Sequence, residues 1–226
     1  GMPQADLIIV TYPPYLSQAN ELADYHRQHD NMRVNVATTT EIYNEFSSGG
    51  QDISAIRDFV RMFYKRAGSD NTQMPSYLLL FGGGSYDYKN RLANNHNFVP
   101  VFESANSVDD NLSLSSDDFY GFLDDSENIE NNSALNVLDI GIGRLPARNA
   151  TDASILVDKV KRYASPSSLG PWRINTTIVA DNGCNDPAGA FTEEEENMAA
   201  IVTSASNNLY NLGKVYLDAM TIISTP

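Results

Sequence analysis

The sequence has few of the residues that usually carry nucleophilic chemistry. Its 226 residues include one cysteine, Cys184, so no internal disulfide can form. The only histidines are His26, His29 and His96. A cysteine nucleophile needs a base within hydrogen-bond reach, and nothing in the spacing brings Cys184 to a histidine. We therefore do not expect Cys184 to act as a nucleophile.

Long apolar runs and positive charges are also scarce. The longest apolar run, Tyr77 to Phe81, is far shorter than the ~20 residues that cross a bilayer as a helix. Lys and Arg number 15 against 29 Asp and Glu, which leaves a formal charge of −14. A field of this sign repels phosphate backbones, so we expect no nucleic-acid partner.

Short β-branched or apolar runs alternate with amphipathic stretches along the chain. This alternation predicts an α/β fold with a mostly parallel sheet and helices on both faces. We expect strands near residues 7–10, 32–36, 77–81, 119–123, 137–142, 174–180 and 215–217. We expect helices near residues 15–29, 40–46, 53–63, 151–163 and 192–209, with Asp52 capping the third.

Two of these helices carry more specific expectations. The helix that Thr151 begins should turn Ile155, Leu156 and Val160 inward. A capping box at residues 192–195 should begin the last helix. Between these two helices, Pro166 to Pro171 is the best boundary, which gives subdomains of residues 5–165 and 171–226.

The loop Gly82-Gly83-Gly84-Ser85 follows a predicted strand, where phosphate-binding loops lie. The chain could therefore be a doubly wound binder of a small ligand. However, neither the dinucleotide-binding pattern nor the Walker pattern is present. Glycines also simply permit a tight exit from a strand.

Paired carboxylates mark several loops, at residues 109–110, 117–118 and 124–125. Calcium requires six to eight oxygen ligands, which such clusters can supply, although no EF-hand spacing is present. The composition alone leaves open whether these carboxylates bind a cation or form a solvated acidic surface.

Several segments together resemble the gingipain peptidase family, C25, and in particular its PorU-like branch of type IX secretion sortases. The similar segments cover nearly the whole chain, at residues 7–10, 77–90, 116–121, 139–146, 179–183 and 214–218. The resemblance implies a caspase-like α/β fold and a secreted or surface cysteine endopeptidase with protein substrates. It further implies cleavage of C-terminal sorting domains and contact with outer-membrane secretion machinery.

The family cleaves with a histidine in a Gly-His-Gly motif and a cysteine one strand later. Neither motif occurs in this sequence. We therefore expect this chain to be a truncated front portion of the domain, inactive alone, with the catalytic pair beyond Pro226. The rival interpretation is a non-catalytic binding or structural module of gingipain-like shape.

The resemblance assigns roles to a few residues. Asp181 matches the acidic residue that orients the catalytic histidine, although Asp181 could also simply close the Asn182-Gly183 turn. Thr192 falls near the position where arginine-specific members place a substrate-pocket aspartate, so arginine specificity is not expected.

Asp124 and Asp139 match acidic positions used for calcium, so we expect these two carboxylates to point toward one loop region. Gly83, however, stands where the family usually has an aspartate. Calcium is the one cofactor that the resemblance implies.

Overall fold

The computed structural model describes residues 1–106, 108, 113–129, 136–181, 190–205, 207 and 209–219. The chain divides into two compact units, Gly1–Tyr163 and Ala164–Pro226. Among the described residues, no helix is both long and apolar enough to cross a membrane.

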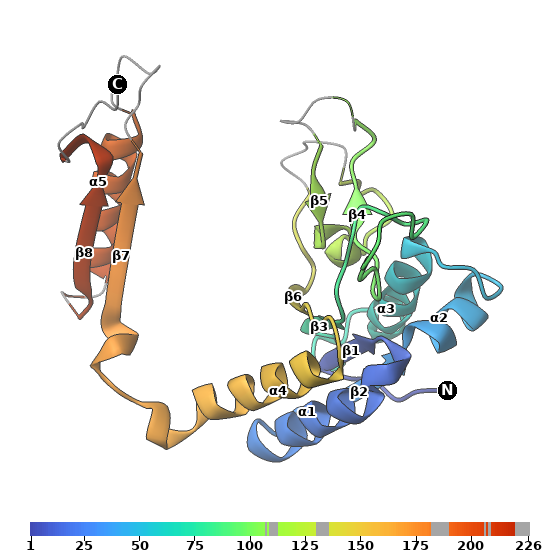
Figure 1. Cartoon of the computed structure of the whole chain (residues 1–226). Helices are drawn as coiled ribbons and strands as arrows, with labels where there is room; N and C mark the ends of the chain where they lie inside the picture. The colour runs from blue at the N-terminus through green and yellow to red at the C-terminus, as the bar shows by residue number, and fades with distance from the viewer. Residues whose placement is uncertain are drawn as a thin grey trace. The chain divides into compact units, whose positions relative to one another are not determined.

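A four-stranded parallel sheet forms the centre of the first unit (Figure 1). Its order is β2-β1-β3-β6, with β1 at Leu7–Thr11, β2 at Val34–Thr38, β3 at Tyr77–Phe81 and β6 at Gly141–Leu145. Leu7 lies opposite both Val34 and Tyr77, and Tyr77 lies opposite Gly141. The strands therefore begin at one edge of the sheet and end together at the other.

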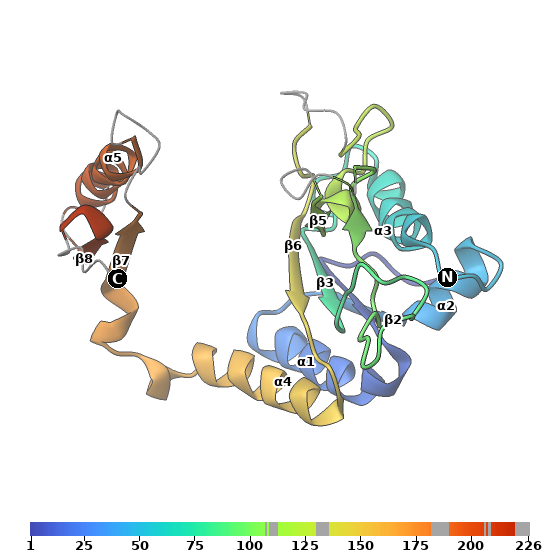
Figure 2. The ribbon, with the colours of Figure 1, turned by 45° about the horizontal axis from the view of Figure 1, so that its top comes forward.

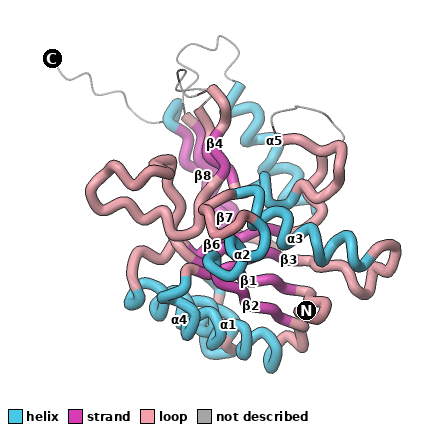
Figure 3. Tube along the Cα trace, turned by 90° about the vertical axis from the view of Figure 1, so that its right-hand side faces the viewer, coloured by secondary structure: helices cyan, strands magenta, loops and turns pink. Residues whose placement is uncertain are grey.

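Helices cover both faces of this sheet (Figures 2 and 3). On one face, α2 (Thr39–Phe46) and α3 (Ile53–Ala67) pack with Ile8 and Val10 in one core. On the other, α1 (Leu16–His29) and α4 (Ala150–Ala164) pack with Leu7 and Ile9. Successive residues of β1 thus point to opposite faces, and both sides are buried. The predicted fold class is confirmed.

Two helices begin at the caps that their sequences encode. Thr38 and Glu41 form a reciprocal capping box at α2, with Glu41 N donating to Thr38 Oγ1 over 3.2 Å. Asp52 Oδ1 accepts a hydrogen bond from Ser54 N at the start of α3, over 2.7 Å, as predicted.

The crossover segment, residues 82–140, connects β3 to β6. It contains the short antiparallel pair β4 (Phe102–Glu103) and β5 (Ser115–Ser116). The strand predicted at residues 119–123 is wrong, because Asp118–Gly121 form a 3₁₀ helix. Ser116 Oγ accepts from Asp118 N over 3.1 Å, and this side-chain turn competes with an extended backbone.

Other predicted elements are displaced. β2 begins two residues later than expected, and β6 occupies residues 141–145 rather than 137–142.

Helix α4 buries Ala153 and Val157, with Leu156 and Val160 packed against the same core. The inward prediction for Ile155 is wrong, since that side chain is 55% exposed. One helical face cannot hold residues 155 and 157 together.

In the second unit, two 3₁₀ turns at Pro166–Ser168 and Pro171–Ile174 lead into a parallel pair, β7 (Asn175–Ala180) and β8 (Asn211–Tyr216). The crossover between these strands contains α5 (Ala190–Ala205). Among the described residues of this unit, Ile178, Ala180 and Ala199 are the buried apolar ones. The capping box predicted at residues 192–195 does not begin the helix, since α5 begins two residues before Thr192, at Ala190.

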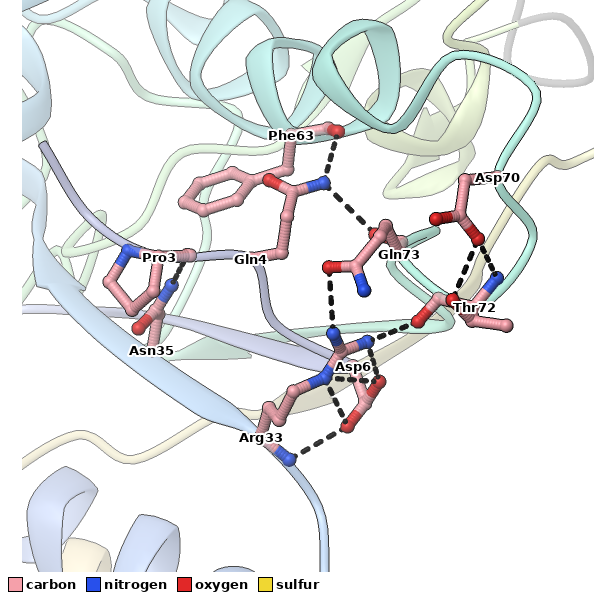
Figure 4. Close-up of polar contacts among 9 residues, drawn as sticks. All are labelled: Pro3, Gln4, Asp6, Arg33, Asn35, Phe63, Asp70, Thr72 and Gln73. Atoms are coloured by element: carbon pink, nitrogen blue, oxygen red, sulfur yellow. Dashed lines mark hydrogen bonds and ion pairs between the residues drawn. The ribbon is translucent and has the colours of Figure 1, made fainter.

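At the edge where the strands begin, a polar network fixes the first residues of the chain (Figure 4). The Arg33 guanidinium and backbone N–H both bind the Asp6 carboxylate, with Nη2 to Oδ1 at 2.5 Å. Arg33 also donates to Gln73 Oε1 and to Thr72 O. Gln4 Nε2 donates to Phe63 O and Gln73 O. This network joins β1 and β2 to the loop before β3.

Candidate functional site

The glycine loop after β3 lies at the edge where ligands bind in open parallel sheets. Here its amides are already engaged, since Gly82 N donates to Leu145 O and Gly83 N to Ala147 O, both over 3.0 Å. Ser85 N donates to Asn97 Oδ1 over 3.1 Å. A phosphate cradle requires such amides to point at the ligand.

The space above this loop is filled by the crossover segment itself. The ring of Phe98 stacks on Tyr12, which follows β1, with ring centroids 4.3 Å apart. A Cβ atom at Gly83 would lie 2.6 Å from the backbone oxygen of His96. The crevice between β1 and β3 is therefore occupied by the protein's own residues, which argues against a doubly wound small-ligand site there.

Arg144 on β6 holds the crossover segment against the sheet. Its guanidinium forms a bidentate pair with Asp117, at 2.7 Å (Nε) and 2.6 Å (Nη2). It also donates to the carbonyls of Gly82 and Val99 over 2.8 Å and to that of Pro100 over 3.3 Å. The fork geometry of Arg satisfies all these acceptors at once.

Asp181 directly follows β7, at the carboxyl end of the strand pair, and its side chain is exposed. It lines a cavity of about 250 Å³ whose other walls are apolar, from Val179, Ala180, Val215 and Leu217. Open parallel sheets bind their ligands at this end of the strands. The role of Asp181 stays a prediction, because the competing Asn182-Gly183 turn lies outside the described residues.

The other residues considered for chemistry fall in three segments, around α5, at the end of α1 and in the crossover segment. Thr192 is half-buried in the first turn of α5. Cys184 lies outside the described residues. His26 and His29 both contact Asp30 at the end of α1, whereas His96 packs against Phe98 in the crossover segment.

Asp124 and Asp139 approach each other, together with Glu127. One carboxylate oxygen from each lies within 4.8 Å of the others. Backbone amides orient the group, since Leu123 N donates to Asp139 Oδ2 over 2.9 Å and Asp124 N to Glu127 Oε2 over 3.0 Å. Three carboxylates offer up to six oxygens, the lower end of what calcium requires.

Neighbouring groups respond to this negative charge. Tyr64 OH donates to Asp139 Oδ1 over 3.1 Å. Burial and that hydrogen bond raise the pKa of Tyr64 to about 12. Lys65 Nζ lies 3.8 Å from Asp124 Oδ1, so part of the charge is already balanced. Lys65 faces only one of the three carboxylates, so the cluster keeps a net negative charge that a cation would reduce.

Gly83 takes no part in this cluster. Gly83 hydrogen-bonds beyond the end of β6, at Ala147, whereas Asp139 precedes its start. The five residues of β6 alone separate these positions by about 13 Å at 3.3 Å per residue. The glycine that departs from the family pattern therefore has no bearing on a site at Asp124 and Asp139.

Sequence reasoning missed Arg144 and Glu127, and it considered Asp117 only as a possible cation ligand, whereas Asp117 pairs with Arg144. Arg144 and Asp117 are 27 residues apart, and pairing over that distance leaves no local signature. Glu127 was detectable, because it lies three residues after Asp124 in a tight turn, where Glu127 N donates back to Asp124 O. A carboxylate at that spacing beside a predicted calcium position was a usable signal.

Comparison with known proteins agrees with this architecture. The latent, dimeric PorU of Porphyromonas gingivalis shares 31% sequence identity over 84% of this chain, with a TM-score of 0.64. The Arg-specific cysteine proteinase gingipain R shares the fold at 17% identity over 98% of the chain, also with a TM-score of 0.64.

This chain spans only 20% of the PorU chain and 44% of the gingipain R chain. No curated protein matches it. The profile of peptidase family C25, in contrast, matches residues 2–225, almost the entire sequence. The chain therefore belongs to peptidase family C25.

Proposed function

We propose that the whole protein is a cysteine endopeptidase acting on protein substrates. The family match over residues 2–225, together with the 31% identity to PorU, carries this proposal. Within it, the described residues supply the sheets and helices on which a catalytic site is built. The histidine and cysteine of the family pattern are expected after Pro226, so this chain alone should not cleave peptides.

Asp181 is the residue of this chain that we assign to the chemistry. A carboxylate at the end of a parallel strand can accept an imidazole N–H, fix the tautomer and stabilise the imidazolium that forms during proton transfer. Its exposed position after β7 supports this role. Thr192, in the helix that follows, is proposed to contribute to the substrate pocket without conferring arginine specificity.

The test is Asp181→Asn in the full-length protein, assayed with peptides of varied cleavage residues under reducing conditions. We expect kcat to fall by roughly 10²- to 10⁴-fold, as when the orienting carboxylate of a catalytic triad is lost. Thermal unfolding should remain nearly unchanged. Glu194→Gln, an exposed acid-to-amide change in the same unit, is the control. Equal activity in the two variants would refute the role of Asp181.

The alternative is a non-catalytic module, and the full-length protein distinguishes the two. An enzyme should be inactivated by iodoacetamide at a cysteine after Pro226, and a module should show no turnover at all. Turnover by the 226-residue chain that disappears in Cys184→Ala would overturn our assignment of the catalytic pair.

We further propose, from the likeness to PorU, a sortase that is secreted or displayed at the bacterial outer membrane and works with the secretion machinery. The substrate would then carry a C-terminal sorting domain. Incubation of the full-length enzyme with such a cargo and with the same cargo lacking that domain tests the proposal. Equal cleavage of both cargoes would refute the sortase role and would indicate a general peptidase instead.

The acidic cluster supports a calcium ion as the one cofactor. Asp124, Glu127 and Asp139 would hold it near the start of β6, away from the carboxyl ends of the strands, so its role would be structural. Ligand binding to the native state raises stability by RT ln(1 + [Ca²⁺]/Kd). Calcium should therefore raise Tm in the wild type and not in Asp139→Asn.

Asp125→Asn is the control for this experiment, because Asp125 is exposed and pairs with Arg61 and Lys65, while its own carboxylate is not one of the three in the cluster. It should keep the calcium response. An identical response of wild type and Asp139→Asn, or no response in either, would end the calcium proposal.

A further inference from the structure

Two of the three histidines in the chain meet a single carboxylate at the end of α1. Nδ1 of His26 lies 2.6 Å from Oδ2 of Asp30, and Nδ1 of His29 lies 2.6 Å from Oδ1 of the same residue. Residues three and four apart are neighbours on a helix surface, so His26 lies beside both partners. Three side chains with metal-binding atoms thus lie within five residues, with the two imidazoles on different oxygens of Asp30 and their ligand atoms not all within 4.8 Å of one another.

We propose that His26, His29 and Asp30 form a binding site for a divalent transition-metal ion such as Zn²⁺. Imidazole nitrogens and a carboxylate oxygen are ligands that this class of ion prefers. Ligand pairs at this helical spacing hold metals in other folds. Each Nδ1 now reaches a different oxygen, so a bound ion would draw the two rings toward one oxygen and replace both hydrogen bonds.

The surroundings favour a cation at this position. The carbonyls at the end of a helix carry partial negative charge. Arg27, which lies between the two histidines in the sequence, is engaged elsewhere, since it donates to Asp24 Oδ1 over 2.7 Å and to Val34 O over 2.5 Å. It therefore does not compete for the Asp30 carboxylate.

There is also room for the rest of a coordination shell. His26 and Asp30 line a cavity of about 470 Å³, together with Met32 and an apolar wall from β1, β3 and β6. Three protein ligands leave one position of a tetrahedral zinc ion open, and water or another small ligand can occupy it from this cavity. The site differs chemically from the all-oxygen cluster at Asp124, which suits calcium.

The test is titration of the 226-residue chain with Co²⁺, followed by its visible absorption, and with Zn²⁺ in competition. One saturable site is expected, and in NMR spectra of the wild type the imidazole resonances of His26 and His29 should respond while those of His96 do not. His26→Gln and Asp30→Asn should each weaken binding at least about tenfold, because even loss of an outer-sphere partner costs that much.

His96→Gln and Asp124→Asn are the controls, and both should bind Co²⁺ like the wild type. The absence of saturable binding would overturn the proposal. So would unchanged affinity in His26→Gln, or imidazole resonances of His26 and His29 that do not respond. The wild-type spectra decide the matter even if a variant fails to fold.

Discussion

Replacement of Arg144 by Met should destabilise the first unit strongly, because the guanidinium satisfies several acceptors at once. The side chains of Arg144 and Asp117 are only 14% and 23% exposed. Without Arg144, the Asp117 carboxylate loses its counter-charge, and the carbonyls of Gly82 and Val99 lose a donor. Removing one partner of a buried pair typically costs about 3–5 kcal/mol, and partial exposure places the expected loss near the lower end.

Two further variants separate charge from geometry. Arg144→Lys keeps the charge but loses the bidentate fork, so we expect about half of that loss. In a double-mutant cycle with Asp117→Asn, the losses should fall short of additivity by about 1–2 kcal/mol, because the two side chains interact directly. Arg148→Met is the matched control. Arg148 also pairs with an aspartate but is 68% exposed, so its loss should stay below about 0.5 kcal/mol.

Urea denaturation followed by far-UV circular dichroism measures these losses. The single tryptophan, Trp172, lies in the second unit, so its fluorescence follows the part of the chain that the substitution does not touch. A loss in Arg144→Met no larger than in Arg148→Met would refute the reasoning, because Arg144 would then behave as an ordinary surface residue.

Two further substitutions test other parts of the first unit. Gly83→Ala should lower the free energy of unfolding in urea by about 2–3 kcal/mol, since the new Cβ would lie 2.6 Å from His96 O, a backbone atom. Gly143→Ala is the control and should be nearly neutral, because the atom nearest to its new Cβ lies 3.9 Å away. Equal losses in the two variants would contradict the close packing at Gly83. Hydrogen bonds from Arg33 lower the pKa of Asp6. Asp6 therefore stabilises the fold above its unfolded pKa of about 3.9, and this contribution disappears as the pH falls through the lower folded value. Asp6→Asn should lower the free energy of unfolding by about 1 kcal/mol at pH 7, a value discounted for partial exposure. The difference in unfolding free energy between variant and wild type should narrow below about pH 4. A difference that stays constant with pH would show that the charge of Asp6 does not contribute.

The sequence predicted elements whose signals are local. The strand at Tyr77–Phe81 is an apolar run that ends in glycines, and α3 has both a cap and a strong apolar stripe. The strand predicted at residues 119–123 failed because burial was mistaken for extended structure. Tyr120 and Leu123 are fully buried, but a tight turn places Tyr120 in the core as effectively as a strand does. Apolar character reports burial more reliably than it reports backbone conformation.

The same difference between local and long-range signals decides which residues of the candidate site could be predicted. Asp181 could be placed from the sequence because it follows a recognisable strand, and its position at a strand end needs no long-range information. The pairing of Arg144 with Asp117 could not be predicted, because it depends on how a long crossover segment returns to the sheet. Single acidic residues were identified, but their partners were found only through the tertiary structure.

Strand β6 explains why the two ends of this sheet serve different purposes. Asp139, just before the strand, gathers Asp124 and Glu127 at the edge where the strands begin. Arg144, one residue before its end, fixes the crossover segment across the opposite edge. The segment that closes this second edge occupies the crevice in which doubly wound proteins bind their ligands. The first unit is therefore a closed scaffold at this end of its sheet, which is why our proposal for catalysis rests on Asp181, after β7 of the second unit.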